Sequence, residues 1–562
     1  MDRTGKRRLI NLASALLLAD AFATSVQKFM AARRSPLAFD DAYMFLRYAH
    51  NIRHGLGFSW NLDGIHTYGP TSLLWSFCVL LLSYLPTDPW TQLILGSWLC
   101  SIAAFVATAW AVAANAKSYW LGSVLRVLPL IVFPLAAATL FQGNQFNGME
   151  TMLATMLCAV LLGLTLLWRD ERVSPAVVGA AGLLLFLARP ESALITLLLP
   201  LFLWFLLEHP RPPLKSLLVL YSVFLAGVVI DLVACQLYFG TPVPLSVYMK
   251  GHHAYLGYRS VWYPGLLLMA FLSITQLFLA ALILLARRRD IRLALACFLP
   301  AAAVFSYLGT VTQIMGFNSR YYIPYAPLIA VPALLVLDRW LAAPPSEPDA
   351  WPGHTLATRA ALTAAMLLFF LVLSSEAVQG KLRHFEHGSH DEYDAAQLNI
   401  TASTALPPVG WQSMMTSITD DLIAPLPPGA TVAATEVGYL GERASQNNII
   451  DLAGLNDTDI ALHGFRVGPF LQRKPDLIWM PNTDYTYQRG ILFSDPTLLA
   501  QYNLYAGGGN YGIAVRKDSP FRSQIDRQLR IFWARTYPGS DPSSYLVHSV
   551  TWTGLKHSAP ND

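Results

Sequence analysis

The sequence predicts a polytopic α-helical membrane protein of about 11 to 13 spans, followed by a polar α/β domain. Of the 562 residues, 54% are hydrophobic and 13% are charged, whereas soluble domains have about 25% charged residues. Apolar runs long enough to cross a ~30 Å hydrocarbon layer as helices recur from Leu9 to Ser375. A polar segment long enough for a folded domain follows them. We therefore expect a membrane domain at residues 1–375 and a second domain at residues 376–562.

Charge and cysteine content exclude two classes of protein. The net charge of +4 is small and scattered, so the chain has no basic surface for nucleic acid. All five cysteines lie in apolar runs, so the C-terminal domain has no disulfide framework.

Basic residues predict the topology, because they stay on the cytoplasmic side of a membrane. The cluster at residues 3–8 precedes an apolar run that is long and lacks a cleavage site, so we expect an uncleaved anchor rather than a signal peptide. A second basic cluster, at residues 287–292, marks another cytoplasmic loop. Counting from these clusters places the loop 31–70 and everything after a last span at 359–375 on the outer face.

The region 71–141 does not fit this count. An even number of crossings is needed there, yet three apolar runs are present, at 71–85, 90–114 and 119–141. The third run contains Pro129 and Pro134, so we expect it to be a broken pair of helices or a non-spanning element.

The outer loop 31–70 opens with two adjacent carboxylates, Asp40 and Asp41, before a predicted helix at residues 41–54. An apolar stripe on this helix indicates that it lies along the membrane surface, and Gly55 and Gly57 end it. The aspartates fit two roles: they can cap this helix, or one can act as general base at a depth that a lipid-linked substrate reaches.

The C-terminal domain alternates β-rich runs with helical stretches. The β-rich runs are at 431–434, 448–452, 476–479 and 512–516. This alternation predicts a small α/β domain on the outer surface.

Other polar residues map to the same outer side. Glu150 opens a helix, where the helix dipole alone would favour an acid. Arg189 and Glu191 flank the helix-breaking Pro190 and are either an internal ion pair or, through Arg189, a site for a lipid phosphate. Arg320 either extends to the interface or binds phosphate.

Transfer from a polyprenyl-phosphate sugar needs a base for the acceptor and cations for the leaving phosphate. The predicted outer side supplies both kinds of group. The acids are Asp40, Asp41 and Glu150, and the cations are Arg189, Lys250 and Arg320.

Several sequence blocks resemble membrane glycosyltransferases of the GT-C class, and in particular the mycobacterial terminal arabinofuranosyltransferase family. The opening block joins Phe39-Asp40-Asp41-Ala42-Tyr43 to Arg47-Tyr48-Ala49 and Thr71-Ser72-Leu73-Leu74-Trp75. Five more follow in order: Asn147-Gly-Met-Glu150, Ala188-Arg189-Pro190-Glu191, Tyr238-Phe-Gly-Thr-Pro-Val-Pro244 with Lys250, Arg320-Tyr-Tyr-Ile-Pro324, and Ile450-Asp451-Leu-Ala-Gly-Leu-Asn456.

The resemblance implies an inverting transfer of a sugar from a polyprenyl-phosphate carrier to a glycan, lipid or protein acceptor, on the outer face of the inner membrane. It implies Asp41 or Asp40 as base, with Asp41 slightly favoured, and a C-terminal domain that helps bind the acceptor. The donor phosphate would be held by Arg189, Arg320 and Lys250, and the acceptor site would include Glu150, Tyr43, Asn147 and Glu191. Residues 67–70 and 315–318 depart from the mycobacterial pattern, so the donor sugar is left open.

Two other functions stay open: a transporter or flippase for polyprenyl lipids or sugars, and a non-catalytic envelope assembly protein. A transporter should show repeated halves and charges along a central path, whereas the charges here cluster on one face. An assembly protein should tolerate loss of both aspartates. A divalent cation, Mg²⁺ or Ca²⁺, on Asp40 or Asp41 is a further open possibility, since both ions prefer oxygen ligands.

Overall fold

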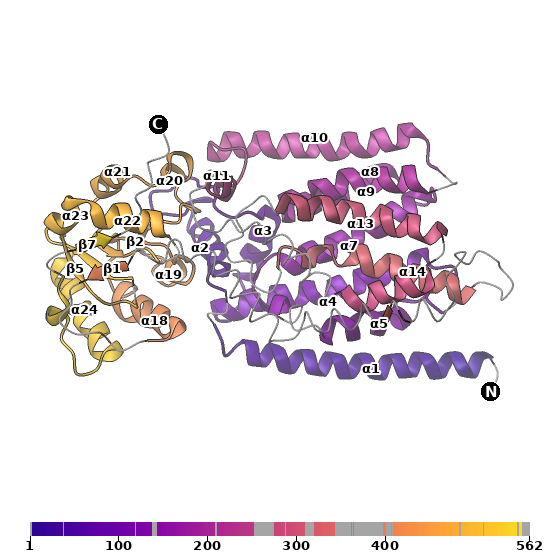
Figure 1. Ribbon diagram of the computed structural model, residues 1–562, viewed down its shortest axis with the longest axis horizontal. Coiled ribbons are helices and arrows are strands. Elements are labelled where there is room, and N and C mark those ends of the chain that lie inside the picture. Colours follow the sequence, from indigo (N-terminus) through magenta and orange to yellow (C-terminus); the bar gives the residue numbers. More distant parts are fainter. Residues whose placement is uncertain are drawn as a thin grey trace.

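The computed structural model describes residues 3–36, 39–118, 120–137, 143–207, 211–251, 275–286, 288–308, 320–342, 361, 363–364, 397–400, 406, 409–482, 485–509, 511–547 and 550–553. Two parts lie end to end along the long axis, a helix bundle and an α/β domain (Figure 1). Of the expected span at 359–375 only residues 361 and 363–364 are described, and the side chain of Lys250 lies outside the described residues.

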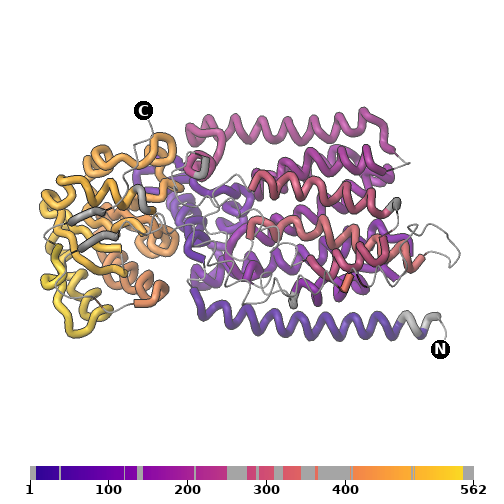
Figure 2. The backbone as a smooth tube through the Cα atoms, in the orientation of Figure 1, coloured from indigo at the N-terminus to yellow at the C-terminus, as the bar shows by residue number. Residues whose placement is uncertain are grey.

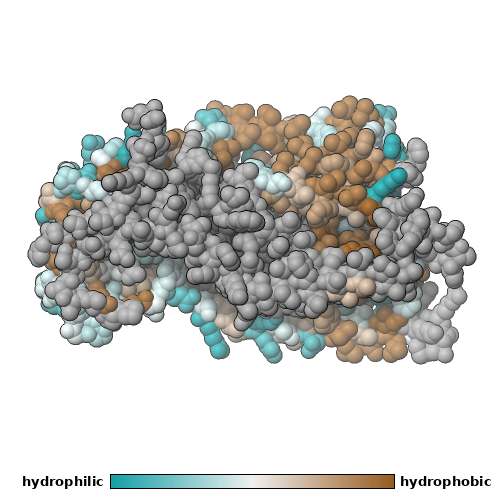
Figure 3. Space-filling model, in the orientation of Figure 1, coloured by the Kyte–Doolittle hydropathy of each residue, from teal (hydrophilic) through white to brown (hydrophobic). Residues whose placement is uncertain are grey.

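The bundle consists of helices that run along the long axis. They are α1 (Arg3–Ala32), α4 (Pro89–Asn115), α5 (Val124–Ala137), α7 (Thr151–Arg169), α8 (Pro175–Ala188), α9 (Ala193–Leu206), α10 (Leu214–Phe239), the helix Thr275–Leu285, α13 (Arg288–Leu308) and α14 (Pro327–Ala342). Six helices of the described chain are long and apolar enough to cross a membrane. On the face that Figure 3 shows, most of the bundle surface that is not grey is hydrophobic, as expected for a membrane protein.

Burial orders these helices from centre to edge. In α7, 83% of the apolar window is buried, against 17% in α10 and 6% in α1. Accordingly, α1 and α10 run along opposite edges of the bundle (Figure 2). The centre of the bundle is therefore α7, whose first residue follows Glu150.

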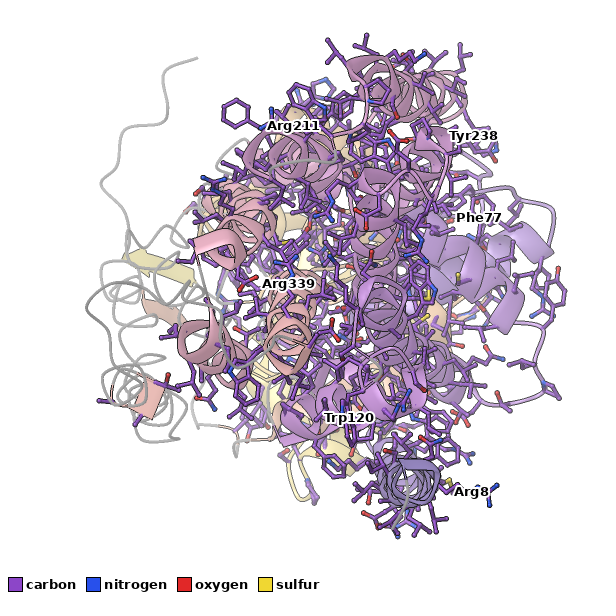
Figure 4. The ribbon with its side chains drawn as sticks, turned by 90° about the vertical axis from the view of Figure 1, so that its right-hand side faces the viewer. Arg8, Phe77, Trp120, Arg211, Tyr238 and Arg339 are labelled. Atoms are coloured by element: carbon purple, nitrogen blue, oxygen red, sulfur yellow. The ribbon has the colours of Figure 1, made fainter. Side chains whose placement is uncertain are left out.

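Basic residues gather at the end of the bundle away from the α/β domain. Figure 4 looks onto this end and labels Arg8, Arg211 and Arg339. Ion pairs and hydrogen bonds tie the helix ends together there: Arg339 Nη1 lies 2.6 Å from Asp290 Oδ1, and the backbone amide of Lys117 donates to Asp338 Oδ2.

The short helix α3 (Leu73–Leu82) lies in the region where the expected count of spans was open. Its ten residues rise only ~15 Å, half of a hydrocarbon layer. Just after α3, the carbonyl of Ser83 accepts a hydrogen bond from Arg53 Nη1, and α4 begins at Pro89. Trp75, Ser76 and Val79 of α3 are buried, and Trp75 Nε1 donates to Gly148 O, whereas Phe77 and Leu81 are exposed. Neither α3 nor α5 is among the helices of the described chain that are long enough to cross a membrane, so the number of crossings between residues 71 and 141 stays a prediction.

The α/β domain is built on a five-stranded sheet of order β3-β2-β4-β6-β5. The strands are β2 (Thr431–Ala434), β3 (Asn448–Asp451), β4 (Leu477–Trp479), β5 (Tyr502–Tyr505) and β6 (Ile513–Arg516). Strands β2, β3 and β4 are parallel to one another, and β6 is antiparallel to both of its neighbours, β4 and β5. The four β-rich runs predicted from the sequence are confirmed, whereas β5 and the separate pair β1 (Gln397–Ile400) and β7 (Val550–Thr553) were not predicted.

Helices complete the domain around this sheet. They are α18 (Trp411–Ser417) with a π-helical turn at Ile418–Ile423, α19 (Gly438–Arg443), α20 (Thr458–His463), α21 (Val467–Gln472), α22 (Thr486–Ser494), α23 (Pro496–Gln501) and α24 (Arg522–Thr536). The parallel strands end at Ala434, Asp451 and Trp479, and the segments that follow β2 and β3 contact the bundle. The sheet therefore presents its carboxyl edge, where open α/β sheets bind ligands, towards the bundle.

Helix α2 (Ala42–Arg53) joins the two parts. Its predicted apolar stripe packs on α3 and α4, and its other face contacts α19. Arg47, Tyr48 and Asn51 on that second face are all buried. The helix itself is confirmed, and the α/β domain covers its face with Arg47, Tyr48 and Asn51; the predicted position of α2 along the membrane surface stays a prediction.

Candidate functional site

A cavity of about 350 Å³ lies where the bundle meets the α/β domain. Its charged lining residues come from distant parts of the chain: Asp41, Glu150, Arg189, Glu191 and Arg320. The apolar part of the wall includes Met44, Phe45, Pro190, Tyr307, Tyr321 and Leu455. The volume falls in the range of ~300–1,000 Å³ that is typical of small-molecule sites.

Arg320 and Asp41 face each other across this cavity. Arg320 is 5% exposed, and its Nη2 lies 3.7 Å from Asp41 Oδ2, beyond hydrogen-bond length, and 3.2 Å from the hydroxyl of Tyr321. Arg320 Nε and Nη1 have no hydrogen-bond partner among the described residues. A buried donor without a partner is costly, so these two N–H groups are unsatisfied positions beside the cavity.

The positive charge of Arg189 is balanced by carboxylates of the protein itself. It ends α8, where Pro190 starts a 3₁₀ turn (Pro190–Ser192) before α9. Its guanidinium contacts Glu191 Oε1 at 2.5 Å and Glu150 Oε1 at 3.1 Å. Of the two interpretations left open by the sequence, this contact set favours the internal ion pair, and a phosphate would have to compete with two carboxylates.

One aromatic ring links the two arginines. The guanidinium carbon lies 4.9 Å from the Tyr321 ring centroid for Arg189 and 5.1 Å for Arg320, so both cations rest on the same ring. Tyr321 belongs to a block quoted above, but its role as a shared platform was missed, because sequence spacing does not show that Arg189 approaches it.

A tight turn sets the position of Glu150 at the head of α7. Asn147 is fully buried, its Oδ1 accepts the amide of Met149, and Gly148 has φ +70°. Glu150 makes no capping hydrogen bond to its own helix, and its Oε2 is buried without a hydrogen-bond partner among the described residues. Asn147 therefore acts on the cavity through Glu150 and does not line it.

The structure separates the two aspartates. Asp41 lines the cavity, whereas Asp40 is buried with its oxygens accepting the amides of Gly438 at 2.9 Å and Tyr439 at 2.7 Å. Burial raises the pKa of Asp40 to about 6, and these two backbone hydrogen bonds oppose the shift. Asp40 thus caps α19 of the other domain and not α2, and its side chain is fully engaged.

Arg47 binds the C-terminal end of α19. It is completely buried, and its guanidinium donates to the carbonyls of Gly441 at 2.6 Å and Asn447 at 2.8 Å, and to that of Trp60 at 2.7 Å. Burial lowers its pKa to about 9, so it remains a cation at neutral pH. With an acid at the first residue of α19 and a cation after its last, α2 matches both ends of the α19 dipole.

Two further predicted site residues, Tyr43 and Lys250, contribute no described side chain to the cavity wall. Tyr43 points away from the cavity: its hydroxyl donates to Pro36 O at 2.6 Å and its ring stacks on Trp90. For Lys250 only the backbone is described, as part of α11 (Leu245–Gly251), the helix that supplies Ser246 and Val247 to the cavity wall.

The loop after β3 brings the α/β domain into the cavity wall through Leu455. The buried carboxylate of Asp451 accepts the amides of Ala453 and Asn456 and the side-chain amide of Asn456. Asn456 Oδ1 in turn accepts the hydroxyl of Tyr48 on α2. Burial raises the pKa of Asp451 to about 7. That this carboxylate organises a loop was not predicted from the sequence.

The formal charges of the ionisable groups that line the cavity do not sum to zero. Three carboxylates face two guanidinium groups, a formal excess of one negative charge among the described lining residues. No group of three or more His, Cys, Asp or Glu residues in the described chain is placed to hold a metal ion. Since Asp40 is occupied by backbone amides, a cation at the aspartate pair would rest on Asp41, and we assign no metal step.

Comparisons with known proteins reach only the second domain. Residues 410–523 match a family described as a domain of unknown function, DUF8728. This segment contains β2 to β6 and the loop that carries Leu455. No curated protein and no solved structure matches the chain.

Proposed function

We propose that this protein is an inverting membrane glycosyltransferase that moves a sugar from a polyprenyl-phosphate carrier to an envelope acceptor. The observation that carries the proposal is the cavity that holds Asp41 opposite Arg320. A carboxylate can accept the proton of an acceptor hydroxyl, and buried N–H donors can stabilise the charge that develops on a departing phosphate.

The reaction uses these groups in one displacement. The acceptor hydroxyl gives its proton to Asp41, and its oxygen attacks the anomeric carbon on the face opposite the phosphate. The bond from that carbon to the phosphate oxygen breaks, and polyprenyl phosphate leaves against Arg320. Inversion follows because a single displacement changes the face of the sugar that carries the bond.

The loose Asp41–Arg320 pair fits this sequence of events. An incoming phosphate offers Arg320 the acceptors that its Nε and Nη1 lack. When Arg320 turns to the phosphate, the positive charge beside Asp41 moves away, and the carboxylate becomes a better base. Binding of the donor would therefore increase the basicity of Asp41, so that the base becomes effective only when the donor is bound.

Localisation is part of the same proposal. Arg8, Arg211 and Arg339 lie at the bundle end opposite the α/β domain (Figure 4), and basic residues at the ends of membrane helices stay on the cytoplasmic side. We therefore place the cavity and the α/β domain on the outer face of the inner membrane. The outer leaflet would deliver the prenyl chain to the cavity, and water would deliver the acceptor.

A deletion strain tests the proposal. Cells without the protein should accumulate one polyprenyl-phosphate sugar and lose one sugar from an envelope glycan, glycolipid or glycoprotein, measured by mass spectrometry. Wild type should reverse both changes, and Asp41→Asn should reverse neither.

Asp63→Asn is a matched control. Asp63 lies in the same loop, is exposed, and accepts only a local amide, that of Ile65, so this variant should restore function. Unchanged carrier lipids and unchanged glycans in the deletion strain would refute the transferase. Full rescue by Asp41→Asn would favour the assembly protein instead.

A further inference from the structure

Helix α1 carries a polar face that nothing in the described chain covers. Asp20 stands at the midpoint of the candidate span Arg8–Ala32 and is exposed. Thr24 and Gln27 are also exposed, and they follow Asp20 at the spacing that places residues on one side of a helix. Hydrocarbon offers no hydrogen-bond partner to these groups.

The opposite side of α1 is the one that meets the bundle. Ser14 is buried, Ser25 Oγ accepts Trp98 Nε1 at 2.7 Å, and the Phe29 ring stacks on Trp98 with centroids 5.0 Å apart. At ~100° per residue these three residues lie roughly 120° to 180° around the helix from Asp20. The acid therefore points directly away from its own protein, and α1 stands at the rim of the bundle in the end-on view (Figure 4).

An ionisable side chain at mid-membrane depth is costly and normally faces protein. Interfaces between membrane helices combine such polar groups with small residues that let two backbones approach. Ala13 and Ala23 are exposed and lie near the same line as Asp20, so this face has both features of a helix–helix contact.

The chemistry of the face selects its partner. A carboxylic acid in its protonated form, a hydroxyl and an amide each donate and accept hydrogen bonds, so this set of groups is complementary to itself. A two-fold axis along the membrane normal would place each residue opposite its own copy at the same depth. The other peripheral helix, α10, exposes mainly apolar residues, among them Leu218, Ile230 and Leu237, together with Ser222 and Gln236.

We propose that the Asp20–Thr24–Gln27 face of α1 binds the same face of a second copy of this chain, forming a parallel two-fold dimer within the membrane. The α1 helices meet at the dimer axis, and each cavity stays at its own bundle. The dimer does not depend on the proposed transferase activity.

Disulfide trapping in native membranes tests the contact. Ala13→Cys adds a thiol on the proposed face, and Ala15→Cys adds one at an exposed position about 140° around the helix from Asp20. Oxidation should give a reducible dimer with Ala13→Cys and none with Ala15→Cys or with wild type, whose five native cysteines serve as the blank. Equal trapping at both positions, or trapping at neither, would overturn the proposal.

A second measurement covers variants in which the new thiol disturbs the helix. Two differently tagged copies should co-purify in mild detergent. The triple variant Asp20→Leu, Thr24→Leu, Gln27→Leu keeps an apolar span and should weaken this association by about tenfold, whereas Asp20→Asn should retain it. Tagged copies that never co-purify, or a thiol at residue 13 that links only to another protein or to residues 359–375 of its own chain, would refute the second copy as the partner.

Discussion

Replacement of Gly438 by alanine should separate the α/β domain from the bundle. A Cβ atom at this position would lie 1.9 Å from the carbonyl oxygen of Asp40 and 2.5 Å from its carbonyl carbon. Ordinary contacts begin at 3.4 Å, and the obstacle is backbone, which cannot swing aside as a side chain can. Helix α19 would have to retreat from α2 by more than about 1 Å.

This displacement of α19 lowers the free energy of unfolding in two ways. Overpacking of a well-packed interior costs about 1–3 kcal/mol. The same movement breaks the hydrogen bonds from the amides of Gly438 and Tyr439 to Asp40, and buried groups left without partners cost about 1–3 kcal/mol. The sum of about 2–6 kcal/mol corresponds to a fall of roughly 5–20 °C in the unfolding midpoint of a domain of this size.

Thermal unfolding of the detergent-solubilised chain, followed by tryptophan fluorescence, measures this loss, since Trp60, Trp479 and Trp533 are buried in the core of the α/β domain. Gly468→Ala is the matched control, because a Cβ there meets no atom within 4 Å and alanine suits a helix better than glycine. It should leave the midpoint unchanged or raise it by a few degrees. If Gly438→Ala unfolded within about 2 °C of this control, the close contact between α19 and α2 would be wrong.

Three further predictions concern the charged groups. Arg320→Gln should lower single-turnover transfer from a polyprenyl-phosphate sugar by roughly a hundredfold with little change in unfolding; an equal rate would exclude Arg320 from the leaving-group site. Arg189→Gln should mainly destabilise, by about 3–5 kcal/mol, because Glu150 would stay buried without its ion pair; a normal unfolding midpoint would contradict this. Burial raises the pKa of Asp40 to about 6 and that of Asp451 to about 7, so between about pH 4 and 7 the folded state binds more protons than the unfolded chain. Stability should therefore fall as the pH rises through this range, and a midpoint that increased from pH 5 to 7.5 would show that the carboxylates are ionised in the fold.

Local patterns predicted most of the elements. The four β-rich runs became strands because their residues alternate or are buried in short apolar stretches bounded by turns, which is a local property. The helix over residues 42–53 and its glycine end were also readable, since periodicity and Gly55 are local signals. The run 71–85 forms the short helix α3, in which Trp75 and Val79 pack on protein while Phe77 and Leu81 stay exposed, so its apolar content alone could not show whether it crosses a membrane.

The site could be predicted only in part, for a physical reason. Charges such as those of Asp41, Arg189 and Arg320 stand out in apolar surroundings, and the structure brings them to one cavity. The role of Asp40 as the cap of α19 could not be predicted from the sequence, because its partners are backbone amides almost four hundred positions away. The roles of Tyr321 and Leu455 depend in the same way on packing between distant segments.

The docking of α2 and its loop onto the α/β domain also sets an order of events during synthesis. Trp60 belongs to the core of that domain, and Trp60 Nε1 donates to Ile449 O, 389 residues further along the chain. At ~5–20 residues per second, a ribosome needs roughly 20–80 s to reach that partner. During this interval the bundle inserts while Trp60 and Arg47 still lack the partners that the α/β domain will provide. These exposed side chains are then a site that a chaperone can bind.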